Sequence, residues 1–158
     1  MNMIFLRSLI AAIGRICLSV IFILSGASKL LNWHEMELTV TNAMNDLNIL
    51  MQGNEVIYQL TAMALPWSKE LLGAAMVFEI IGGLLVFLGI RVRLGALLLI
   101  LFLIPTTFLF HHYWLLQGAD RELQMTMFLK NLSILGGLFV VLALGTGGNK
   151  GKNCAKLP

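Results

Sequence analysis

The sequence predicts an all-α fold: a four-helix transmembrane bundle with an amphipathic extracytoplasmic cap between spans one and two. Of the 158 residues, 58% are hydrophobic and only 12% are charged, and the mean hydropathy is +0.86. A soluble domain is about half apolar and about a quarter charged. The chain has three prolines, and its glycines show no period, so disordered and collagen-like classes are excluded. We expect a single membrane domain over residues 1–158.

Four apolar segments have the length of a membrane span. They cover about residues 8–31, 71–90, 94–113 and 123–144. A helix needs about 20 apolar residues to cross a bilayer, and only helices and closed barrels satisfy the backbone inside lipid. Strand-like alternation is absent, which favours helices. The first segment is longer than the apolar part of a signal peptide, so we expect it to remain as a span.

The charges at the span ends predict the orientation of the chain. Six basic residues fall on one side of a four-span arrangement, and two, Lys69 and Arg121, fall on the other. Cytoplasmic loops carry an excess of Lys and Arg. We therefore expect both termini, with the tail 145–158, in the cytoplasm and the connection 32–68 outside. The six basic residues are Arg7, Arg91, Arg93, Lys150, Lys152 and Lys156.

The connection over residues 32–68 carries its own helical pattern. Its apolar residues recur at helical spacing, and a second short apolar stretch covers residues 56–65 before Pro66. We interpret the connection as helices that cap the outer mouth of the bundle. The alternative is an interfacial helix that lies on lipid. The recurring apolar residues are Met36, Val40, Ala43, Leu47 and Leu50.

Ionisable and amide side chains inside the spans are the candidate site. Charges in the hydrocarbon are costly, so they usually face the protein interior and often mark function. Small residues on the same helix faces indicate packing faces, and the rise per residue places the candidates in the outer half of the membrane. We expect one polar pocket that opens outward beneath the cap; the alternative is a structural ion-pair cluster. The candidates are Lys29, Glu79, His111, Lys130 and Asn131.

Other features indicate less. Pro105 predicts a kink in the third span, and Arg15 is expected to reach the cytoplasmic interface or a lipid phosphate. His111 and its neighbour His112 lack the partners of a metal site, so we expect none. No basic stripe with interleaved aromatics indicates nucleic acid. No nucleotide, haem or hydrolase motif is present. The lipid bilayer is therefore the one partner that composition itself predicts.

Several sequence pieces resemble the DoxX family of small four-helix membrane proteins. The match covers most of the four spans, and the connection 32–68 is longer and less familiar. The pieces are Gly14-Arg15, Gly26-Ala27-Ser28-Lys29-Leu30, Phe78-Glu79-Ile80-Ile81-Gly82-Gly83-Leu84-Leu85, Gly89-Ile90-Arg91-Val92-Arg93, Lys130-Asn131 and Gly136-Gly137. The resemblance implies a bacterial cytoplasmic (inner) membrane. Some relatives are similar to quinone-reducing membrane subunits of thiosulfate dehydrogenases, and others are linked with membrane redox or stress-response complexes.

Two functions follow from the resemblance and the polar residues together. We favour an accessory or scaffold subunit that packs against protein partners in a larger membrane complex of the redox or respiratory type. The alternative is a quinone-linked oxidoreductase subunit. In it, Lys29 and Lys130 hold an oxyanion such as thiosulfate, Glu79 and His111 handle protons, and Asn131 orients the ligand.

The residues leave open whether the chain is an enzyme. No side chain here carries electrons alone, so a quinone or a partner would have to supply the redox chemistry. A quinone is the cofactor that the resemblance allows, and the sequence identifies none by itself. A cavity among the five polar side chains would favour the oxidoreductase subunit, and its absence would favour the scaffold.

Overall fold

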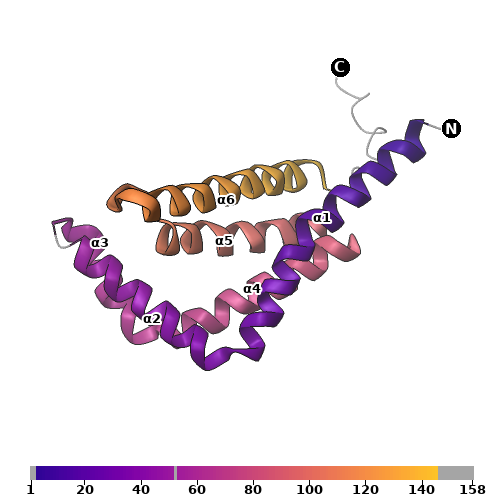
Figure 1. Ribbon diagram of the computed structural model, residues 1–158. Coiled ribbons are helices and arrows are strands. Elements are labelled where there is room, and N and C mark those ends of the chain that lie inside the picture. The colour runs from indigo at the N-terminus through magenta and orange to yellow at the C-terminus, as the bar shows by residue number, and fades with distance from the viewer. Residues whose placement is uncertain (1–2, 52, 146–158) are drawn as a thin grey trace, which may run out of the picture.

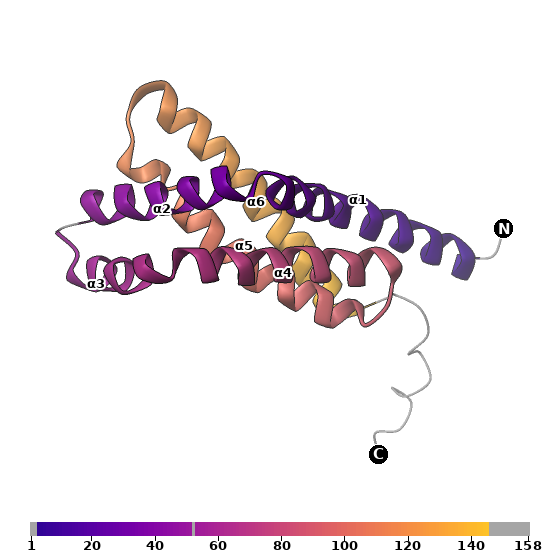
Figure 2. The same ribbon diagram turned by 90° about the horizontal axis from the view of Figure 1, so that it is seen from below.

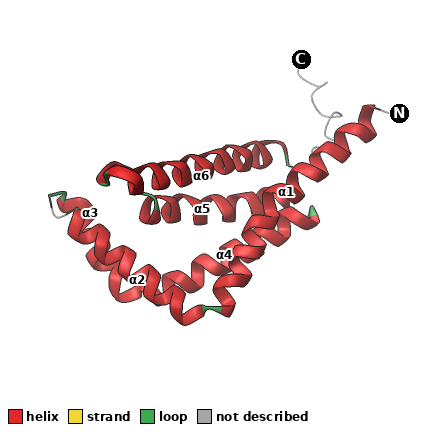
Figure 3. Ribbon diagram, viewed as in Figure 1, coloured by secondary structure: helices red, strands yellow, loops and turns green. Residues whose placement is uncertain are grey.

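The computed structural model describes residues 3–51 and 53–145, and regular structure in this part of the chain is helical throughout (Figure 3). The four longest helices are α1 (Met3–Leu31), α4 (Ser68–Leu88), α5 (Val92–Phe110) and α6 (Gly118–Leu144). The shorter elements are α2 (Trp33–Leu50), α3 (Glu55–Ala64) and the 3-10 turns η1 (Leu65–Trp67) and η2 (Tyr113–Leu115). The all-α prediction is therefore confirmed.

Four segments of the described chain are long and apolar enough to cross a membrane. They are Phe5–Leu31, Glu55–Leu88, Val92–Leu115 and Gly118–Leu144. Each overlaps one predicted span, but Glu55–Leu88 begins sixteen residues before the predicted second span and includes α3. The expectation of four long apolar helices is confirmed. Three of the basic residues used for orientation, Lys150, Lys152 and Lys156, and the tail beyond residue 145 lie outside the described residues.

Helices α4 and α5 form the centre of the bundle because glycines let them approach closely. A Cβ on Gly82 would lie 2.9 Å from Leu99 Cγ, and one on Gly95 would lie 2.8 Å from the Gly82 carbonyl oxygen. Small residues allow this approach between membrane helices. Figure 1 shows α5 between α4 and α6, with α1 crossing α4 obliquely. The core contains Phe22, Val86, Leu99, Phe102 and Leu138.

Helices α2 and α3 form a helical hairpin that bends away from α1 and α4. The bends fall at Asn32, between α1 and α2, and at η1, which contains Pro66. Figures 1 and 2 show the two helices side by side at one end of the bundle. On α2, Met44 is buried together with Leu72 and Met76 of α4. The predicted helices of the connection are therefore present, and α2 packs on protein.

Candidate functional site

Helices α1 and α4 bring together two of the predicted site residues, Lys29 and Glu79. The Lys29 Nζ donates a hydrogen bond to Glu79 Oε2 at 2.5 Å and another to Ser25 Oγ at 2.8 Å. Glu79 is only 1% exposed. The helices meet closely because α1 has Gly26 at this height, where a Cβ would lie 2.5 Å from Ile80 Cγ1. A buried carboxylate is thus matched by an ammonium on the neighbouring helix.

The Lys29 ammonium has capacity for one further acceptor. It carries three N–H donors, of which Ser25 and Glu79 take two. Its Nζ lies 5.0 Å from the centroid of the Phe102 ring, which adds a cation–π contact. The side chain is 17% exposed, so a ligand can reach it. The third donor is therefore the polar group that this site can offer.

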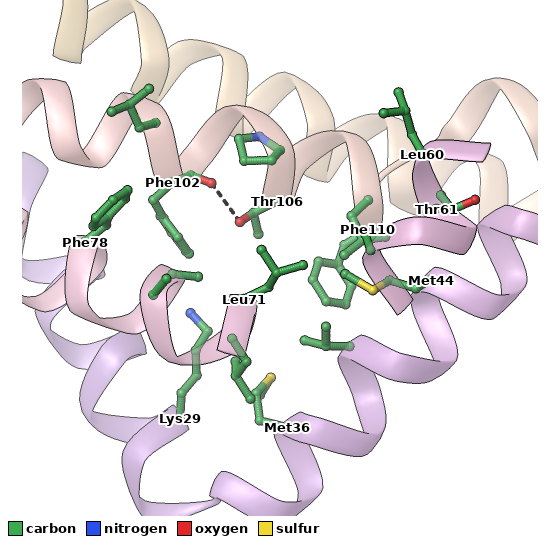
Figure 4. A pocket seen from close by; sticks show the side chains of 18 residues that line it. Lys29, Met36, Met44, Leu60, Thr61, Leu71, Phe78, Phe102, Thr106 and Phe110 are labelled. Carbon is green, nitrogen blue, oxygen red and sulfur yellow. Dashed lines mark hydrogen bonds between the residues drawn. The ribbon is translucent and has the colours of Figure 1, made fainter. Parts of the chain in front are cut away.

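A cavity of about 440 Å³ begins at Lys29 and extends between the helical hairpin and α4 and α5. Figure 4 shows Lys29 and Phe78 at one end of it, and Leu60 and Thr61 at the other. Its lining is largely apolar, with aromatic rings from Phe78, Phe102 and Phe110. Thr106 adds a hydroxyl, but this group already donates to the Phe102 carbonyl oxygen at 2.8 Å. The cavity suits an apolar ligand with one polar end.

The other predicted site residues lie elsewhere. Asn131 Nδ2 donates to Thr107 Oγ1 at 3.0 Å, which joins α6 to α5. His111 Nδ1 lies 2.7 Å from Gln124 Oε1, and Lys130 is exposed on α6. None of these three predicted residues lines the cavity. The expectation of one polar pocket shared by five side chains is therefore corrected: the described residues form separate polar contacts.

The rotation of α6 explains why Lys130 is not in the cluster. Leu138 marks the face of α6 that is buried, and Asn131, seven residues earlier, lies about 20° from it at 100° per residue. Lys130 lies on the other side of Leu138, about 80° from it and about 100° from Asn131. It shares a face with Gly137, where a Cβ would lie 3.4 Å from Leu18 Cδ1 of α1. Toward the start of α6, however, α1 and α6 diverge (Figures 1 and 2), and Lys130 is exposed.

The sequence reading missed the apolar wall of the cavity. Phe78 and Phe102 lie in spans that are apolar along most of their length, so composition cannot separate cavity-facing residues from lipid-facing ones. Two signals pointed toward this wall. One was the stripe that contains Met36 and Val40 on α2, and the other was Pro105 in α5; all three line the cavity. Neither signal gives the position of the helical hairpin against the bundle.

Comparisons with known proteins agree with this architecture. The DoxX family model matches residues 10–112, a segment that contains both Lys29 and Glu79. The chain is also similar to the protein named Inner membrane protein YphA of Escherichia coli (strain K12). The two are 25% identical over 141 residues, which cover 89% of this chain and 86% of the relative. No solved structure matches. With its four apolar spans, the chain belongs to the DoxX family of integral membrane proteins.

Proposed function

We propose that this DoxX-family chain is a quinone-binding subunit of a redox complex in the bacterial inner membrane. The observation that carries the proposal is the apolar cavity of about 440 Å³, which Lys29 lines at one end while its partner Glu79 stays buried behind it. The described residues form no cavity among all five predicted polar side chains, which taken alone would favour the scaffold; the cavity beside Lys29 is what favours a bound quinone. Small-molecule sites usually have volumes of about 300–1,000 Å³ and few polar groups. The name of the YphA relative supports the inner membrane. In this proposal both termini are cytoplasmic, and the helical hairpin is the extracytoplasmic cap over the cavity.

The residues of the cavity fit the head group of a quinone. A quinone ring has two apolar faces, and the rings of Phe78 and Phe102 line the cavity beside Lys29. Its carbonyl oxygens accept hydrogen bonds, and Lys29 retains one donor. A small oxyanion such as thiosulfate fits less well, because Glu79 already neutralises Lys29 and an apolar wall does not solvate a charge.

The chain's own residues would then bind and orient the quinone. Lys29 donates through Nζ to a ring oxygen, while Glu79 and Ser25 hold the ammonium in place. Glu79 is 1% exposed and does not line the cavity, so its part is to fix the position of the ammonium through Oε2. A quinone, when bound, supplies the two-electron chemistry that no side chain here can perform. His111, Lys130 and Asn131 stay outside the proposed site.

The exposed face of α6 supports contact with a protein partner. Leu138 is its one fully buried residue within the described part of the helix, and Lys130 stands exposed within the span. A lysine in a membrane segment usually faces protein, water or a headgroup. Contact between this face of α6 and another subunit would supply such surroundings. Cross-linking from a photoreactive residue at Lys130 in native membranes should capture a second protein; capture of lipid alone would contradict the contact.

Quinone binding can be tested with the full chain reconstituted in nanodiscs. A short-chain ubiquinone is titrated, and tryptophan fluorescence reports its binding because Trp33 packs beside the cavity lining. We expect saturable quenching, with Lys29→Gln weakening the affinity about tenfold, equivalent to about 1.4 kcal/mol. Lys69→Gln, a change of an exposed lysine at the start of α4, should leave the affinity unchanged. Quenching that does not saturate, or equal affinities for wild type and Lys29→Gln, would contradict the proposal.

A further inference from the structure

A second charged side chain, Arg15 of α1, lies against the turn between α4 and α5. The turn begins at Gly89, whose φ of 75° is left-handed. The Gly89 N–H donates to the Val86 carbonyl, and the Ile90 N–H donates to that of Leu85, which closes the end of α4. A Cβ on Gly89 would lie 3.0 Å from Arg15 Nη1. The guanidinium therefore packs on bare backbone that a larger residue would cover.

Arg15 has no counter-ion in the described part of the chain. Its Nε is buried without a hydrogen-bond partner, and it is the one buried side-chain nitrogen or oxygen of the described residues in that state. The guanidinium offers five N–H donors and no acceptor. Along α4, the nearest acid is Glu79, ten residues or about 15 Å from Gly89, and Lys29 already occupies it. Arg15 is half-buried rather than enclosed, so an anion from outside the chain can supply its counter-charge.

The start of α5 adds further donors at the same turn. Arg91, the residue before α5, makes no side-chain cap, and its carbonyl accepts from the N–H groups of Leu94 and Gly95. The first N–H groups of a helix lack acceptors within it, and they favour anions. The Arg93 side chain stays at this end of the bundle, because its Nη2 donates to the Ala143 carbonyl at 2.9 Å. The turn thus combines guanidinium and backbone donors with no acid.

We propose that Arg15 and the turn over residues 89–93 bind the phosphate group of an anionic phospholipid. A guanidinium pairs with phosphate oxygens through two parallel hydrogen bonds. Lipid is the source of the phosphate because Ile13 and Ile16, on either side of Arg15, are exposed apolar residues that acyl chains would cover. The site lies at the opposite end of α4 from the helical hairpin, so it is independent of the quinone proposal.

The test is native mass spectrometry of the full chain released from detergent, with phosphatidylglycerol as the probe and phosphatidylcholine for comparison. We expect one phosphatidylglycerol to bind at least tenfold more tightly than phosphatidylcholine. Arg15→Gln should weaken this binding about tenfold, and Arg15→Lys, which keeps the charge but loses the paired geometry, about threefold. Arg7→Gln is the matched control, because Arg7 is an exposed arginine on the same helix. It should change the affinity less than twofold.

Three results would overturn the assignment. The first is equal weakening by Arg15→Gln and Arg7→Gln, which would show attraction by charge alone. The second is equal affinity for the two lipids. The third is displacement of the lipid by millimolar inorganic phosphate, which would make the site one for free phosphate. If Arg15→Gln fails to fold, Arg15→Lys decides: unchanged lipid affinity in that variant would refute the paired geometry, and a loss relative to Arg7→Gln would support it.

Discussion

Replacement of Glu79 by alanine removes the counter-ion that the described structure gives Lys29. The carboxylate is 1% exposed, and its Oε2 lies 2.5 Å from the ammonium. Removal of one partner of a buried ion pair costs about 3–5 kcal/mol. Because the Lys29 side chain is 17% exposed and can reach water in part, we expect about 3 kcal/mol. For a chain of this size, that loss lowers Tm by roughly 6–12 °C.

The double variant Lys29→Met with Glu79→Leu separates the ion pair from general packing. Removal of both charges leaves neither one buried alone, so the double variant should be more stable than Glu79→Ala. With Lys29→Met and Glu79→Leu also measured as single variants, the coupling energy between the two positions should be about 1.5 kcal/mol or more. The assay is thermal unfolding in one detergent, followed by far-UV circular dichroism. Glu70→Ala, at an exposed position at the start of α4, is the control and should change stability by less than about 0.5 kcal/mol.

Two results would refute this reasoning about the ion pair. One is a Tm of Glu79→Ala within the experimental error of the wild type. The other is a double variant whose loss equals the sum of the two single losses, because additive losses mean that the two side chains do not interact. Either result would mean that the Lys29–Glu79 contact does not stabilise the pairing of α1 with α4.

Three further predictions concern the bundle and its orientation. Gly82→Leu should lower Tm strongly or prevent folding, because its side chain would meet Leu99 and α5 backbone, whereas Gly136→Leu, with open space, should be tolerated; equal effects on Tm would contradict the close crossing. Asn131→Leu should cost about 0.6–1 kcal/mol by removing the bond to Thr107, and an unchanged Tm would contradict that contribution. A cysteine at Arg91, in a cysteine-free background, should react with an impermeant thiol reagent only from the cytoplasmic side; labelling from outside would invert the orientation.

The fold was largely predictable from the sequence because the bilayer imposes strong constraints. A span has to be long, apolar and helical, so residues 71–90 and 94–113 could be assigned from composition. The end of α4 was visible in the Gly89 turn, since glycine accommodates the left-handed backbone there. The helices of the connection were visible in the spacing of Met36 and Val40. Periodicity does not give the angle at which the helical hairpin leaves the bundle.

The candidate site was predictable only in part. The Lys29–Glu79 contact could be predicted, because a buried charge is stabilised by an opposite charge at the same depth in the membrane. Lys130 was also placed in the outer half of the membrane, yet it is exposed. Its surroundings depend on its position around α6 and on the divergence of α1 from α6 (Figure 1). The cavity depends on the packing of α2 against α4 and α5, a long-range feature that leaves no mark on an apolar sequence.

Quinone binding in the apolar cavity beside Lys29 is the proposal on which the function of this chain depends. The most direct measurement is photolabelling of the membrane-embedded chain with an azido-quinone, followed by peptide mapping. With a quinone in the cavity, labels should fall on cavity residues such as Met44 and Phe110, and Ala75→Phe, which fills the cavity, should lose at least tenfold of the label. Val77→Phe, at an exposed position two residues further along α4, should keep the label. Equal labelling of both variants, spread over lipid-facing residues, would contradict the claim.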